Sequence, residues 1–191
     1  MINKITKEII TCLDNNCPLA ALTLALTLPD ICGKAMYPDL SGNKNCKARY
    51  VKWFDDYIGD FEKEEVKGLG LPRYCGELIY SLRCSMLHQG NPNIDEKYSE
   101  KRNIIRFELL YKQNEGCNEL IGSTVARVVT DSDGKEIAVD NQYSINVRDL
   151  CWRICNLAEI CFKNNKDKFD FFEYNIYEMD FITRDLFEVK K

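Results

Sequence analysis

The sequence is poor in histidine: His88 is the only one among 191 residues. The ten cysteines include no Cys-x-x-Cys pair, and a single histidine does not complete a Cys/His zinc site. We therefore expect no metal and no cofactor. Buried thiols in a reducing compartment are the favoured interpretation, with Cys151, Cys155 and Cys161 packed inward from one helix.

The chain also lacks an excess of positive charge, with a net charge of -4 and a pI of about 5.2. Proteins that coat nucleic acid are usually basic, so any contact with nucleic acid must come from a local patch or be transient. The longest apolar run, residues 17–32, is interrupted by Pro18 and Pro29. The stretch between these prolines is shorter than the roughly 20 residues that span a bilayer. Glu8 and Asp14 in the preceding segment also argue against a signal peptide. We expect a cytoplasmic protein without membrane contact.

Helical periodicity is what the sequence does contain. Apolar residues recur with helical spacing in residues 3–14, 18–28, 47–58, 72–90 and 146–165. The fourth of these segments has an inner stripe formed by Cys75, Leu78, Ile79, Leu82 and Met86. Its other side is apolar as well, through Tyr80, Cys84 and Leu87. A helix with two apolar sides requires a second covering, either from this chain or from a second subunit.

Residues rich in β-branched side chains follow at 104–111 and 124–140. Asp133-Gly134 between two such runs predicts a hairpin, and Asn146 is a candidate cap for the last long helix. We therefore expect a mainly α, α+β fold in one domain, residues 1–191. It would be a helical bundle with a small antiparallel β-meander, residues 101–145, inserted before the last long helix. Residues 174–182 are a further candidate strand.

Arg83 and His88 stand near the end of the 72–90 helix, before Gly90 and Pro92, which predict the helix stop. Five residues correspond to about 140° around an ideal helix. The two side chains therefore meet only if the helix bends or ends near His88, or if the site is assembled from two copies.

The segment Arg83-Cys-Ser-Met-Leu-His88 resembles the R-x4-6-H motif of the HEPN superfamily, and the match covers mainly residues 72–92. The resemblance implies a helical bundle, commonly a homodimer, and in many members a metal-independent ribonuclease of toxin–antitoxin, abortive-infection or other defence systems. RNA or a nucleotide is then the expected ligand, and an antitoxin or defence-system protein the expected partner. The minimal HEPN bundle has no strands equivalent to those predicted here, which is why we treat them as an insertion.

The resemblance assigns catalysis to Arg83 and His88, with Tyr80, Ser85 and Glu77 as candidate substrate-binding or orienting residues. The chemistry suits these residue types. An imidazole can transfer protons near neutral pH, and a guanidinium can hold phosphate oxygens and stabilise the charge that develops on them.

Two alternatives stay open. Cys84 stands where active members usually have a polar residue, which favours a noncatalytic HEPN-like module that binds a nucleotide or a protein. Arg83 and His88 can also be purely structural, capping carbonyls at the helix end and pairing with Glu77.

Overall fold

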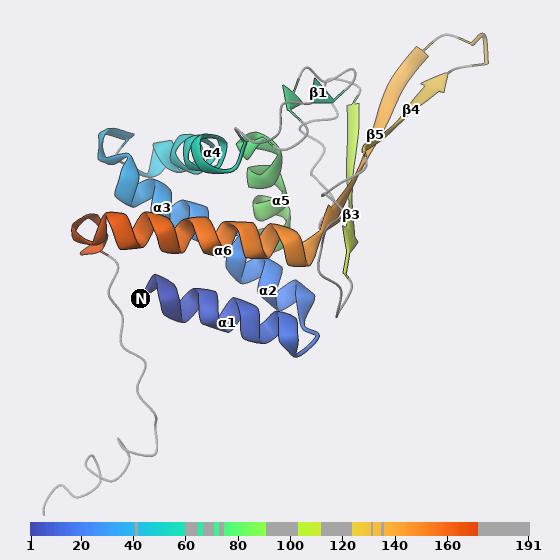
Figure 1. The fold of residues 1–191 in the computed structure, drawn as a ribbon. Helices are drawn as coiled ribbons and strands as arrows, with labels where there is room; N and C mark the ends of the chain where they lie inside the picture. The colour runs from blue at the N-terminus through green and yellow to red at the C-terminus, as the bar shows by residue number, and fades with distance from the viewer. Residues whose placement is uncertain are drawn as a thin grey trace, which may run out of the picture.

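The computed structural model describes residues 1–40, 42–59, 65–66, 71–72, 75–90, 103–111, 124–130, 132–134 and 136–171. The predicted strand at 174–182 lies outside these residues. The described part is mainly helical with a small sheet, and the sheet precedes the last long helix as expected. Figure 1 shows the bundle on one side and the strands extending away from it.

The N-terminal half is a run of short helices. They are α1 (Ile2–Asp14), α2 (Pro18–Ala25), α3 (Leu28–Met36) and α4 (Cys46–Tyr57), with 3-10 turns η1 (Pro38–Leu40) and η2 (Asn43–Asn45) between the last two. We expected Pro29 to end a helix, but it lies in the first turn of α3. Proline is tolerated there because the first amides of a helix have no intrahelical acceptor, so the chain turns and resumes as a helix at once.

The Pro18–Met36 segment, which includes α2 and α3, is long and apolar enough to cross a membrane by length and composition alone. Half of its apolar window is buried inside the structure, and a buried core helix passes the same test. Leu22, Leu26 and Leu28 are fully buried in the core.

Two further helices follow along the chain, α5 (Gly76–Gln89) and α6 (Val147–Asn164), and α6 is followed by the 3-10 turn η5 (Lys166–Phe169). α6 packs against α1, α2 and α3, while α4 packs against α3 and α5 (Figure 1). The inner stripe predicted for α5 is confirmed, since Cys75, Leu78, Ile79, Leu82 and Met86 are all buried. The cap predicted for α6 is confirmed too, because the Asn146 side chain accepts a hydrogen bond from the Asp149 amide at 3.1 Å.

The start of α5 differs from the expectation. The helix begins at Gly76 rather than at Pro72, which belongs to the two-residue strand β2 (Leu71–Pro72), paired with β1 (Glu65–Val66). The Gly76 amide donates to Asp55 Oδ1 of α4, so α4 supplies the acceptor for this first amide of α5, which has none within its own helix.

The larger sheet has the strand order β3-β5-β4, with β3 at Asn103–Leu110, β4 at Thr124–Thr130 and β5 at Glu136–Asn146. β4 and β5 are antiparallel, as predicted for this hairpin, and Gly134 in the loop between them has a φ of 75°, a left-handed conformation that glycine adopts without strain. The prediction of an antiparallel meander is nevertheless wrong, because β3 runs parallel to β5. β3 pairs with β5, the strand that leads into α6, rather than with its sequence neighbour β4. This pairing depends on contacts between distant parts of the chain, which the local sequence pattern does not specify.

Candidate functional site

Helix α5 positions both residues of the candidate motif. Its inner stripe is anchored in the core, which leaves Arg83 half-buried and His88 exposed in the last turn. Gly90 ends the helix in the left-handed conformation with a φ of 65°, and its amide donates to the Met86 carbonyl at 3.1 Å. The helix stop predicted from Gly90 is therefore confirmed.

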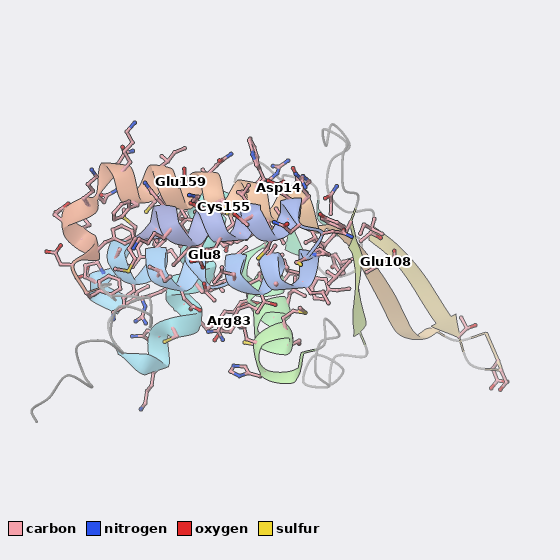
Figure 2. The ribbon with its side chains drawn as sticks, turned by 90° about the horizontal axis from the view of Figure 1, so that it is seen from below. Glu8, Asp14, Arg83, Glu108, Cys155 and Glu159 are labelled. Atoms are coloured by element: carbon pink, nitrogen blue, oxygen red, sulfur yellow. The ribbon has the colours of Figure 1, made fainter. Side chains whose placement is uncertain are left out.

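Arg83 and His88 meet within one chain. Arg83 Nη1 lies 3.5 Å from His88 Nε2, at the outer limit of a hydrogen bond. The length of the arginine side chain bridges the angle between the two positions, so neither a bend in α5 nor a second copy is needed to bring them together. Figure 2 shows Arg83 beside α5, next to the N-terminal helices.

The remaining donors of Arg83 are directed at Asp30 of α3. Nε and Nη2 lie 3.0 Å and 2.8 Å from the same oxygen, Asp30 Oδ2. The two side chains are 22% and 27% exposed, so this is a partly desolvated ion pair. The pair fixes one edge of the guanidinium on α3 and leaves Nη1 facing His88.

Burial and the ion pair act in opposite directions on both groups. Burial favours the neutral form of Arg83, but Asp30 and the neighbouring Cys84 thiol outweigh it and raise the pKa of the guanidinium. Burial raises the pKa of the Asp30 carboxyl, and the attraction of Arg83 and Arg49 offsets only part of that increase.

The other three residues predicted for the site have different surroundings in the structure. Tyr80 is in place, with its ring centroid 5.8 Å from Arg83 Cζ and its edge against the Tyr50 ring. Ser85 is buried, at 4% exposure, and does not face solvent. Glu77 forms an ion pair with α4, where its Oε1 lies 3.1 Å from Lys47 Nζ. The structure thus groups Tyr80 with Arg83 and His88, and pairs Glu77 with another helix.

A cavity of about 700 Å³ opens beside Arg83. Its lining includes Asp30 and Lys34 of α3, Arg49 of α4 and Arg83 of α5, with Tyr37 and Phe171 contributing aromatic surface. Sequence reasoning missed Asp30, Lys34 and Arg49. The i, i+4 spacing of Asp30 and Lys34 places them on one helix face, but nothing in the sequence indicates that this face meets Arg83, 53 residues later.

Five of the nine described cysteines lie inside the protein, where small apolar side chains would pack. Cys32, Cys75, Cys151, Cys155 and Cys161 are buried free thiols. Within the described ranges, no group of three or more His, Cys, Asp or Glu side chains could hold a metal ion. A second groove, of about 640 Å³, runs between α1 and α6 and includes Asp14, Cys155 and Glu159 in its lining (Figure 2).

No protein-family model matches the chain, and neither the curated proteins nor the solved structures include a match to it. The resemblance to the HEPN motif therefore rests on the residues of α5 themselves.

Proposed function

We propose that this chain is a HEPN-like protein that acts as a metal-independent endoribonuclease of a defence or toxin type, with Arg83 and His88 as its catalytic residues. The observation that carries the proposal is the 3.5 Å approach of Arg83 Nη1 to His88 Nε2, which pairs a phosphate-binding group with the chain's only imidazole. The half-buried Arg83 lies in the middle of α5 and reaches towards His88 in the last turn, where the exposed imidazole is accessible to a single strand of RNA.

The reaction would use the RNA's own nucleophile. The 2′-oxygen attacks the adjacent phosphorus, the bond from phosphorus to the 5′-oxygen breaks, and the products are a 2′,3′-cyclic phosphate and a 5′-hydroxyl. One group must accept the proton of the 2′-hydroxyl and another must donate a proton to the leaving 5′-oxygen. His88 is suited to one of these transfers, and Arg83 Nη1 to the charge that builds on the phosphorane oxygens.

A noncatalytic module that binds a nucleotide is the second candidate, and the Asp30–Arg83 ion pair favours it. Two of the guanidinium donors are already directed at Asp30 Oδ2, so fewer remain for a transition state. The residue next to Arg83 is Cys84, whose thiol is only a weak hydrogen-bond donor and acceptor. In this case RNA stays intact and a bound nucleotide or protein copurifies.

Incubation with total RNA in EDTA tests the catalytic proposal. The parent should cut single-stranded RNA and leave 2′,3′-cyclic ends, whereas His88→Ala should not. Arg83→Lys is the second variant: it keeps a positive charge beside Asp30 but lacks the planar fork with Nη1, and should also be inactive. Lys4→Gln, an exposed change on α1, is the control and should cut normally.

The stability of the same proteins separates catalysis from capping. Because His88 is exposed, His88→Ala should unfold at nearly the parent's urea concentration. If RNA is cut equally by the parent and by His88→Ala, the proposal of His88 as a catalytic residue is wrong. If His88→Ala also unfolds much more readily, the histidine is a structural cap.

A further inference from the structure

Two of the buried cysteines lie next to each other across the contact between two helices. Cys32 of α3 and Cys161 of α6 are 0% and 1% exposed, and both are free thiols. Their helices pack together, and the two side chains share a hydrogen bond. The two positions are far apart in the sequence, so it is the folding of the chain that brings these thiols together.

Cys161 is the thiol of this pair that can ionise. The hydrogen bond with Cys32 lowers the pKa of Cys161 from an ordinary value of 9.0 to about 7, with further help from Trp53 and Lys168 and against the opposing effect of burial. The same hydrogen bond, together with burial, raises the pKa of Cys32. Cys32 therefore keeps its proton and donates it to the Cys161 sulfur. A thiolate is the form of cysteine that attacks an oxidant.

Trp53 of α4 provides a second donor beside the Cys161 sulfur. Its indole Nε1 is buried and forms no hydrogen bond of regular geometry within the described part of the chain. It faces the Cys161 sulfur and helps to hold it as a thiolate. A buried N–H without an acceptor is unfavourable, and a charged sulfur is a better acceptor than a thiol, so this environment favours the ionised form of Cys161.

The neighbouring cysteines of α6 have a different environment. Cys151 and Cys155 are buried one helical turn apart, and burial raises the pKa of both thiols. Both therefore stay protonated near neutral pH, where Cys161 is partly ionised. The difference makes Cys155 a suitable control for Cys161 on the same helix.

We infer that Cys32 and Cys161 are a redox pair that a hydroperoxide converts into a disulfide joining α3 to α6. The Cys161 thiolate attacks one oxygen of hydrogen peroxide, the O–O bond breaks, and Cys161 becomes a sulfenic acid. The hydroxide that leaves takes up the proton that Cys161 released. The Cys32 sulfur then attacks the Cys161 sulfur, the S–O bond breaks, and the proton of Cys32 leaves with the hydroxide as water. The two thiols give up two electrons, which reduce one peroxide to two waters.

The position of Cys161 near the end of α6 gives the oxidant a way in. The helix ends at Asn164, and Ile160 and Lys163 on either side of Cys161 are exposed. Helix ends open at a lower cost in free energy than the middle of a core, so opening of the last turn exposes the sulfur. Hydrogen peroxide is little larger than water, and a partial opening therefore admits it.

Mass spectrometry of the full chain and of its peptides is the first test. The fully reduced protein is treated with a small excess of hydrogen peroxide, and the remaining free thiols are then alkylated. We expect the first disulfide to join residues 32 and 161, with a loss of two free thiols per chain and full recovery after reduction by dithiothreitol. Cys155→Ala should form the same bond, whereas Cys161→Ala should not.

Three results would overturn the inference. They are a first disulfide between other cysteines, oxidation of Cys161 to a sulfinic acid without a bond to Cys32, and an undiminished loss of two thiols in Cys161→Ala. The linked peptide is identified in the parent itself, so the first two results can be read even if Cys161→Ala does not fold.

Urea denaturation of the oxidised and the reduced protein tests whether the bond fits the packing of α3 on α6. A disulfide between distant positions restricts the unfolded chain, so the oxidised parent should unfold at a higher urea concentration than the reduced parent. Cys32→Ala should unfold at the same concentration before and after treatment. An oxidised parent that unfolds at the same or a lower concentration contradicts the inference. Neither test involves RNA, and neither Cys32 nor Cys161 belongs to the candidate site, so the proposed function stands or falls separately.

Discussion

The guanidinium donors of Arg83 make contacts with two different side chains, Asp30 and His88. Nε and Nη2 hold Asp30 across the α3–α5 contact, while Nη1 faces His88 at 3.5 Å. A guanidinium suits such a division because its donors are fixed in one plane, so anchoring one edge aims the other. Asp30 is in this sense a positioning residue for the candidate site, although it stands in a different helix.

Asp30→Ala should destabilise the protein. The substitution leaves the partly buried guanidinium of Arg83 without its carboxylate, and we expect the free energy of unfolding to fall by about 1–3 kcal/mol. Urea denaturation at pH 7 measures this, with the exposed Asp39→Ala as the matched control. If Asp30→Ala and Asp39→Ala unfold alike, the ion pair does not stabilise the fold.

Cys155 should make stability sensitive to alkaline pH. Burial, with a contribution from Glu159, raises the pKa of its thiol from an ordinary value of 9.0 to about 12. The pKa of this thiol is higher in the folded than in the unfolded chain. Its contribution to the free energy of unfolding is therefore complete below pH 9 and is lost as the pH rises towards 12. Above pH 9 the unfolded chain releases this proton and the folded chain keeps it.

The measurement compares parent and Cys155→Ala by urea denaturation under reducing conditions at pH 8 and pH 10. Between these values the parent should lose about 1.4 kcal/mol more than the variant, which has no thiol to titrate at this position. Cys32 and Cys75 have raised pKa values too and remain in both proteins, so they cancel in the comparison. The pKa of Cys151 is raised mainly by burial, which both proteins share, and in smaller part by Cys155. Equal losses would show that the Cys155 thiol titrates normally.

At the level of elements, local chemistry predicted where the helices lie and some of their ends, although Pro29 and Pro72 misplaced two others. The stripe of α5, the Gly90 stop, the Asn146 cap and the Asp133-Gly134 turn all follow from neighbours within a few residues, and all are present in the structure. Partners far apart in the sequence could not be predicted in this way. Asp30 reaches Arg83 across 53 residues, and β3 pairs with β5 rather than with β4, because these choices depend on how whole elements pack.

Two glycines set how closely the helices approach, and sequence reasoning missed both. A Cβ at Gly76 would lie 2.5 Å from the Val51 carbonyl oxygen, and a Cβ at Gly33 would lie 2.7 Å from that of Arg49. The obstacle is backbone in both cases, so no side chain can move aside. Both contacts arise only when the helices pack together. In the sequence alone, each glycine indicates no more than a position of low helix propensity.

Gly76→Ala should therefore destabilise the protein even though alanine is the better helix former. We expect a loss of about 1–3 kcal/mol from overpacking between α4 and α5. Ala48→Ser, an addition of one atom on the exposed side of α4, is the control and should change the unfolding free energy little. A Gly76→Ala protein as stable as the parent would mean that α5 can move away from α4 without loss.

At the scale of the whole molecule, the helices and the sheet meet at one end of the strands. Phe107 of β3 and Tyr143 of β5 are opposite each other in the parallel register, with ring centroids 5.9 Å apart, and both are buried in the helical core. Ser144 Oγ donates to Glu108 Oε2 at 2.8 Å beside them. Since β5 continues directly into α6, the inner end of the sheet is held by the bundle while its other end extends away (Figure 1).

We predict that the protein forms a homodimer through the outer side of α5, formed by Tyr80, Cys84 and Leu87. Tyr80 on that side is covered from within the chain by its contact with Tyr50, which leaves half-buried Cys84 and Leu87 next to exposed His88. A second copy on this side would cover them and bring two His88 side chains towards one RNA strand, supplying both the acid and the base that cleavage needs. Trp152, 57% exposed on α6, marks a rival surface.

Light scattering at micromolar concentration should give about 44 kDa, twice the chain mass of 22.2 kDa. Leu87→Glu should shift this to the monomer mass because it places two unpaired carboxylates in the α5 contact, and Trp152→Glu should remain dimeric. The variants should keep the parent's circular dichroism, since neither side chain is fully buried. A monomeric parent contradicts the prediction outright. A dimer that is lost in Trp152→Glu but kept in Leu87→Glu places the interface on α6, where the two His88 side chains would not be brought together by α5.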